Sequence, residues 1–185
     1  SAVHHATAFP LLWPRHTPAN ASAPAANSAM QMPAQTAASV RAVLPVAWYP
    51  LATQHLLLRT IDRTLGAGDG ELARVIGRYE ADQDLTLVHR LFLRMANPAF
   101  VLEKAGDYWS RFYEAGTWTV TRGEGGTSAR GELREVEPTD ELFCLYLEAY
   151  VMRMFELVGA KDVRGSHSRC RCRGAEACVF EGRWS

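Results

Sequence analysis

The apolar residues of this chain change their spacing abruptly after Gly116, and this change limits the folds that the chain can adopt. Before Gly116 they recur at intervals of three and four residues, which is typical of amphipathic helices. From Thr117 to Arg122 the sequence TWTVTR alternates, and SARGELREV alternates again after the turn GEGG, as expected of a β-hairpin. Helices and strands that occupy separate blocks of a chain favour an α+β fold.

Four consecutive helices are predicted ahead of this hairpin, because each apolar pattern has its own start or stop signal. The first runs from Pro50 to Gly66, since proline suits the first helical turn and glycine suits the residue that follows the last turn. The other three begin after Asp69, Asp84 and Asn97, whose side chains can accept hydrogen bonds from the first free amides of a helix.

A long helix and a second hairpin are predicted after the first hairpin. Asp140 and Glu141 can start the helix ELFCLYLEAYVMRMFELVG, which closes at Gly159. Two short strands follow at about 162–169 and 177–184. The predicted fold is therefore α+β, with a helical N-terminal half, then a β-hairpin, a long helix and a β-hairpin, forming an antiparallel sheet of about four strands.

The first 38 residues differ in composition from the rest of the chain. Residues 17–37 are rich in Ala, Pro, Asn and Ser and hold no charged or aromatic side chain, so 1–38 is predicted to be flexible or loosely packed. The sequence FPLLWP, at 9–14, could still form a small anchoring strand. Residues 39–185 are predicted to form a single domain, since this length suits one core.

The charge and hydropathy of the chain bear on whether it binds nucleic acid or a membrane and on where it is located. Twenty basic and twenty acidic residues predict no overall attraction to nucleic acid or to an anionic membrane. No apolar run approaches the roughly 20 residues that span a bilayer, and the N-terminal sequence lacks the pattern of a signal peptide. Cysteines that crowd beside a histidine without an export signal favour a reduced, cytoplasmic protein.

The segment SHSRCRCRGAEACVF, 166–180, holds three of the four cysteines and one of the six histidines. The remaining cysteine, Cys144, lies on the face of the long helix that is expected to meet the core. If that helix crosses the sheet, Cys144 can approach His167, Cys170 and Cys178. Thiolates and imidazole are the ligands that a tetrahedral structural zinc site uses, and such a site would fasten the helix to the sheet.

The spacing of these residues is not that of a standard zinc finger, and it leaves other interpretations open. Cys144 could be only a small buried apolar residue. Cys170 and Cys178 could form a disulfide in an exported protein, and Cys172 could be an ordinary exposed thiol. A catalytic Cys–His pair is disfavoured because no Asn or Asp is placed to orient His167. The chain is accordingly predicted not to be an enzyme.

Arginines surround the same segment, at positions 164, 169, 171 and 173. They could contact nucleic acid beside the predicted metal. Arginines at alternate positions of a hairpin more often mark a solvated strand face, and the chain is neutral overall. Nucleic acid is therefore not predicted as a partner.

Aromatic side chains cluster on the last early helix and on the strand after it: Trp109, Phe112, Tyr113 and Trp118. The simpler interpretation places them in the core. Alternatively, part of this cluster lines an apolar pocket between the helices and the sheet. His89, in LVHRLF, could lie near such a pocket, although a buried and hydrogen-bonded histidine is the simpler interpretation there too.

From about residue 48 to residue 184 the chain resembles the 4-vinyl-reductase-like domain superfamily. The likeness rests on WYPL, on DYWSRFYEAGTWTV and above all on FCLYLEAYVMRMFELVGAKDVRGSHSRCRCRGAEACVFEGRW. The same region is similar to the zinc-bearing sensor domains of phenol-responsive, sigma-54-dependent activators, and to uncharacterised bacterial members of the superfamily from myxobacteria. Residues 1–40 lie outside the resemblance.

The resemblance implies a zinc ion held by Cys144, Cys170 and Cys178, with His167 in place of an acidic ligand of the family. The turn GAEAC departs from a Gly-Asp turn of the family, and Cys172 has no counterpart there. The resemblance further implies a non-enzymatic sensor or regulatory domain that binds an apolar or aromatic small molecule, and a homodimer. A protein-interaction scaffold, as in trafficking subunits, and an accessory role in tetrapyrrole biosynthesis are the alternatives.

Overall fold

The structure is a computed structural model of the chain, and it describes residues 3–5, 48–88 and 97–185. The helices are α2 (Leu51–Leu65), α3 (Glu71–Val88), α5 (Pro98–Phe112) and α6 (Glu141–Leu157). The strands of the main sheet are β3 (Thr117–Arg122), β4 (Ser128–Arg134), β5 (Arg164–Arg169) and β6 (Cys178–Arg183). They form a four-stranded antiparallel sheet in the order β3-β4-β6-β5. The predicted α+β fold is confirmed.

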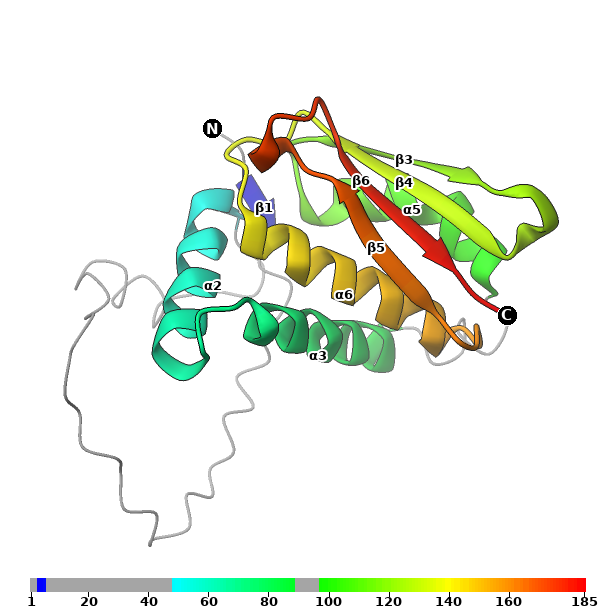
Figure 1. The fold of residues 1–185 in the computed structure, drawn as a ribbon, viewed down its shortest axis with the longest axis horizontal. Helices are drawn as coiled ribbons and strands as arrows, with labels where there is room; N and C mark the ends of the chain where they lie inside the picture. The colour runs from blue at the N-terminus through cyan, green and yellow to red at the C-terminus, as the bar shows by residue number, and fades with distance from the viewer. Residues whose placement is uncertain (1–2, 6–47, 89–96) are drawn as a thin grey trace, which may run out of the picture.

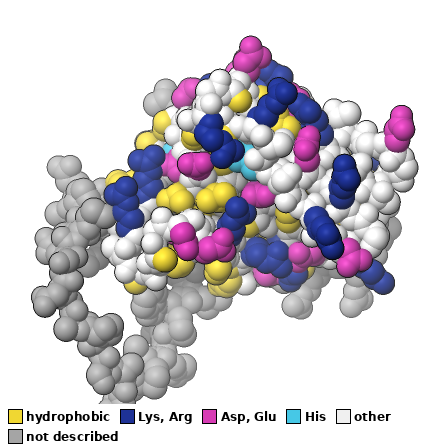
Figure 2. All heavy atoms as spheres, in the orientation of Figure 1, with side chains coloured by type: hydrophobic (Ala, Val, Ile, Leu, Met, Phe, Trp, Pro, Cys, Tyr) yellow, Lys and Arg dark blue, Asp and Glu magenta, His cyan; other side chains and the backbone are white. Residues whose placement is uncertain are grey.

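The helices pack on one face of the sheet. In Figure 1 the sheet lies in front of α5 and partly in front of α6, α3 runs beside α6, and α2 stands near the start of α6. The same view with all atoms shows charged side chains spread over the face that the sheet turns to the viewer (Figure 2). None of the described helices combines the length and apolar character needed to cross a bilayer.

Side-chain caps begin two of the helices where the sequence predicts them. Asn97 accepts a hydrogen bond from the Phe100 amide at 3.0 Å. The Asp140 carboxylate accepts from the amides of Leu142 and Phe143 at 2.8 and 3.2 Å. Both predicted starts are confirmed, because these acceptors satisfy amides that have no partner within the helix.

The predicted helix start at Asp84 is wrong. Helix α3 continues through Asp84 to Val88, since no glycine or proline interrupts the sequence between Glu80 and Val88. The remainder of that predicted helix, 89–96, lies outside the described residues, as does the strand predicted at 9–14. Within the predicted N-terminal segment a short strand, β1 (Val3–His5), pairs antiparallel with β2 (Trp48–Pro50). The division at residue 38 stays a prediction.

Helices α3 and α6 approach each other closely because α3 presents small residues at a spacing of four. Ala73 and Ala81 are fully buried, and a Cβ atom added to Gly77 would lie 2.2 Å from the carbonyl oxygen of Tyr146. That distance is well inside van der Waals contact with a backbone atom. A glycine is therefore required at this position for the two helices to pack as they do.

The inner face of the sheet packs against the face of α6 on which the sequence predicts that Cys144 meets the core. Cys144, Leu147, Phe155 and Val158 are all buried. The hairpin of β5 and β6 makes room for this helix with a pair of glycines that lie directly opposite each other, Gly165 and Gly182. Met152 of α6 fills the space, and its sulfur would lie 2.3 Å from a Cβ atom added to Gly165.

Candidate metal centre

Three parts of the fold bring the predicted ligands together. Cys144 lies in the first turn of α6, where its amide donates to the carbonyl oxygen of Asp140 at 3.1 Å. His167 lies on β5, Cys178 begins β6, and Cys170 precedes a short 3₁₀ turn. Residues that are distant in sequence therefore converge where the start of α6 meets the last hairpin (Figure 1).

The Cys3His group, defined as Cys144, His167, Cys170 and Cys178, has the dimensions of a tetrahedral site. The four ligand atoms all lie within 4.8 Å of one another. The sulfur of Cys144 lies 3.7 Å from that of Cys178 and 4.0 Å from that of Cys170. Tetrahedral zinc with zinc–sulfur distances of about 2.3 Å separates its sulfur ligands by about 3.8 Å. The group could therefore hold one metal ion.

The burial of the group also suits a metal. The three thiols are buried and His167 is half-buried. The His167 ring stacks on Phe180 with a centroid distance of 4.5 Å and an interplanar angle of 10°. Its Nε2 atom is buried and has no hydrogen-bond partner among the described residues. Leaving such an atom unpaired costs about 1–3 kcal/mol, and a metal ion is one partner that would satisfy it.

The thiols of the group do not share one protonation state. The pKa of Cys178 is lowered to about 4, chiefly because its sulfur accepts a hydrogen bond from the Cys144 thiol; His167 and the Arg171 amide act in the same direction. That hydrogen bond, together with burial, holds the pKa of Cys144 far above its usual range, and burial raises the pKa of Cys170 to about 11. The two shifts favour a single thiolate shared by the hydrogen-bonded pair of Cys144 and Cys178. A divalent cation would displace the remaining protons, because thiolates are the ligands.

The turn between β5 and β6 keeps the sulfur atoms of Cys170 and Cys178 within 4.8 Å of each other. The amides of Arg173 and Ala175 donate to the carbonyl oxygen of Cys170 at 3.0 and 3.1 Å. Gly174 adopts a left-handed conformation, with a φ of 85°, which glycine adopts without steric cost.

Arg171 connects this turn to the segment ahead of α6. Its amide donates to the Cys178 sulfur at 3.4 Å. Its guanidinium donates to the carbonyl oxygen of Val136 at 2.8 Å and pairs with Glu137 at 2.5 Å. From the sequence, Arg171 is only one of four arginines around the cysteine segment. Nothing in the local sequence indicates this contact, because it joins residues 35 positions apart.

Only one of the two cysteines of the sequence CRC lies in the Cys3His group. Cys172 is exposed and does not belong to the Cys3His group, whereas Cys170 is 1 % exposed and does. All four cysteines are unbridged. The interpretation of Cys170 and Cys178 as a disulfide therefore has no support in the structure.

The predicted pocket residues are only partly brought together. Trp109 stacks on Tyr113 and on Trp118, with centroid distances of 4.2 and 5.9 Å, whereas Phe112 packs against Tyr108 instead. Trp109 and Trp118 are 7 % and 8 % exposed and belong to the main core. The position of His89 lies outside the described residues. Whether these residues line a pocket stays a prediction.

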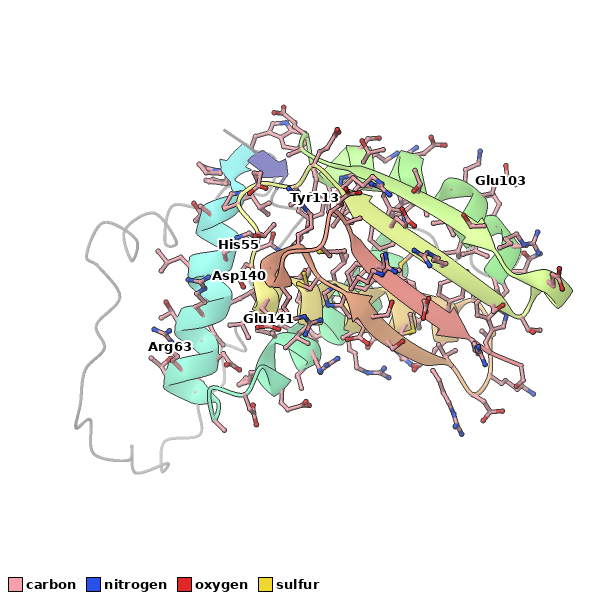
Figure 3. The ribbon with its side chains drawn as sticks, turned by 45° about the horizontal axis from the view of Figure 1, so that its top comes forward. His55, Arg63, Glu103, Tyr113, Asp140 and Glu141 are labelled. Carbon is pink, nitrogen blue, oxygen red and sulfur yellow. The ribbon has the colours of Figure 1, made fainter. Side chains whose placement is uncertain are left out.

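Helix α2 contributes neighbours of the start of α6 that no sequence motif indicates. His55 lies 5.1 Å from the ring of Phe143, and Arg59 pairs with the buried carboxylate of Asp140 at 2.6 Å. Figure 3 shows His55, Asp140 and Tyr113 at the same end of the molecule, where α2 meets the start of α6. The carboxylate that caps α6 thus also forms an ion pair with α2.

Comparison with known proteins reveals a shared fold. No family model matches the chain, and no curated protein matches it. The structure is similar to an H-NOX protein from S. oneidensis in the Fe(II)NO ligation state, at 10 % identity and a TM-score of 0.57, over 74 % of this chain and 77 % of that one. It is similar as well to an unliganded Fe(II) H-NOX protein from K. algicida, at 10 % identity and a TM-score of 0.54, over 77 % of each chain.

A weaker likeness concerns the phenol-responsive sensory domain of the transcription activator PoxR with phenol. It has 17 % identity and a TM-score of 0.43, over 77 % of this chain and 79 % of that one. A TM-score of this size carries no argument about function. The comparisons establish a fold shared with H-NOX proteins, and membership of the 4-vinyl-reductase-like superfamily stays a prediction.

Proposed function

We propose that this protein is a non-enzymatic regulatory domain with a structural zinc ion bound by Cys144, His167, Cys170 and Cys178. The observation that carries the proposal is the convergence of four ligand atoms within 4.8 Å, three of them from buried thiols. Four protein ligands leave no open position for a substrate, which is the arrangement of structural rather than catalytic zinc.

In this proposal the metal fastens the last hairpin to helix α6. When bound, the ion would supply a cross-link between residues that are 26 and 34 positions apart, and its binding free energy would add to the stability of the fold. The chain itself positions the ligands. Asp140 sets the start of α6, and Arg171 holds the turn that carries Cys170.

The test is the metal content of the purified protein, measured by elemental mass spectrometry without added metal or chelator. We expect one zinc per chain, and we expect Cys144→Ala and Cys178→Ser to lose it. Cys172→Ser is the matched control, because this exposed thiol lies outside the group. Absence of zinc from the unsubstituted protein, or equal loss in the control, would refute the proposal.

We further propose that the domain senses an apolar or aromatic small molecule. The sequence resemblance supports this proposal, and so does a continuous stack of rings that passes from Trp109 through Trp118 and Phe180 to His167. A ligand that displaced part of this stack would move the metal centre. Titration with phenols, followed by tryptophan fluorescence, tests the idea, and an unchanged spectrum would contradict it.

A protein-interaction scaffold is the second candidate. One observation favours it: Trp109 and Trp118 are buried against each other, so that the chain's own side chains occupy the region of the predicted pocket. A homodimer in the cytoplasm is proposed for either function. Light scattering coupled to size-exclusion chromatography would measure the oligomeric state, and a monomer at micromolar concentration would contradict the dimer.

A further inference from the structure

The outer edge of strand β5 (Arg164–Arg169) is a free backbone edge within the described part of the chain. The strand order β3-β4-β6-β5 leaves β5 with one neighbour, and no described strand pairs with its other side. Five of its six residues are exposed, and His167 is half-buried. An edge of this kind offers a row of amide and carbonyl groups to a further strand.

The same strand carries positive charge that the fold leaves unpaired. Arg164 and Arg169 lie at its two ends, and the register places Arg183 directly opposite Arg164. Among the residues that the structure describes, none of these three guanidinium groups has an acidic partner within ion-pair distance. The nearby carboxylate of Glu181 lies 3.8 Å from Arg130 of β4. Like charges directly opposite each other destabilise a sheet, so a partner that neutralises them would bind favourably.

The charge pattern selects among the possible occupants of this edge. In an antiparallel pairing of two copies over all six residues, Arg164 would face Arg169 of the second copy, and the two like charges would repel. Sites that bind single-stranded nucleic acid commonly present aromatic side chains on which the bases stack. The exposed residues of β5 are only Arg, Gly and Ser, so this strand offers no such side chain. An extended acidic peptide meets neither objection.

We infer that the free edge of β5 binds an extended, acidic segment of a partner protein, which adds to the sheet as a fifth strand. Main-chain hydrogen bonds along β5 would supply the pairing. Carboxylates of the segment would pair with Arg164 and Arg183, since guanidinium groups bind carboxylates in a planar, two-point geometry. Figure 2 shows Lys and Arg side chains on this face of the molecule, with Asp and Glu side chains between them. The inference does not depend on the proposed metal.

The binding test uses the full chain and a fluorescein-labelled peptide of alternating glutamate and threonine. We expect an anisotropy increase that weakens as salt is added. Arg164→Glu combined with Arg183→Glu should weaken binding by at least about tenfold. The matched control is Arg63→Glu combined with Arg111→Glu, because it reverses the same amount of charge on helices α2 and α5.

Amide hydrogen exchange of the unsubstituted protein separates strand addition from simple charge attraction. Exchange of residues 164–169 should slow when the peptide is bound, because a new strand would occupy their free groups. Unchanged exchange in this segment would overturn the inference, and so would equal loss of binding in the control variant. Tighter binding of a single-stranded oligonucleotide than of the peptide would overturn it as well.

Discussion

Removal of the proposed zinc ion should lower the unfolding free energy of this domain, and the size of the decrease can be estimated from the Cys3His group. The relevant perturbation is Cys178→Ser, because this thiol is 3 % exposed and touches both Cys144 and the turn of Arg171. A metal at a free concentration of about one thousand times its dissociation constant stabilises the folded state by about 4 kcal/mol. A serine hydroxyl buried without its full set of partners costs about 1–3 kcal/mol more.

The two contributions together predict that Cys178→Ser loses about 5–7 kcal/mol of unfolding free energy. For a chain of this size each kcal/mol shifts the melting temperature by about 2–4 °C, so the variant should melt about 10–28 °C lower. The assay is thermal unfolding followed by circular dichroism, with and without a zinc chelator. Cys172→Ser should melt like the parent, because its side chain is exposed and outside the Cys3His group.

The chelator isolates the metal's share of the effect. It should lower the melting temperature of the parent and of Cys172→Ser, and it should leave Cys178→Ser unchanged, since that variant holds no metal to lose. A parent whose melting temperature does not respond to the chelator would refute the reasoning, even if Cys178→Ser proved unstable. In that case the instability would come from the buried hydroxyl alone.

Three further predictions concern the packing of α6 against α3 and against the sheet. Burial raises the pKa of the Tyr146 phenol well above its usual value, and Glu80 beside it acts in the same direction. The unfolded phenol therefore ionises first, and the unfolding free energy should fall as the pH rises above about 10; denaturant titrations should show a smaller alkaline loss for Tyr146→Phe. Gly165→Ala should cost about 1–3 kcal/mol by collision with Met152, and a second change, Met152→Ala, should recover part of that loss in a double-mutant cycle. Gly77→Ala should be at least as costly in the same assay, because its Cβ atom would meet a backbone oxygen that cannot rotate away; parent-like stability would show that α3 can shift.

The sequence by itself determined the helices and strands that local signals control. Asn97 and Asp140 begin helices because a side chain two or three residues away satisfies the first free amides, and this chemistry depends on the immediate neighbours alone. The alternation after Gly116 likewise sets the hairpin of β3 and β4. Asp84 shows the limit of such signals, since an aspartate within a helix looks the same in sequence as one that caps it.

Only the tertiary structure decided which of the candidate residues meet. The order β3-β4-β6-β5 places β6 between β4 and the edge strand, which sets the last hairpin over the start of α6. Cys144 thereby reaches Cys170 and Cys178, while Cys172, two residues beyond Cys170, is exposed to solvent. Contacts between residues so far apart depend on how whole elements pack, and packing depends on the shapes of many side chains at once. Spacing along the chain could therefore suggest the ligands of a metal, but the choice among the cysteines rested on the fold.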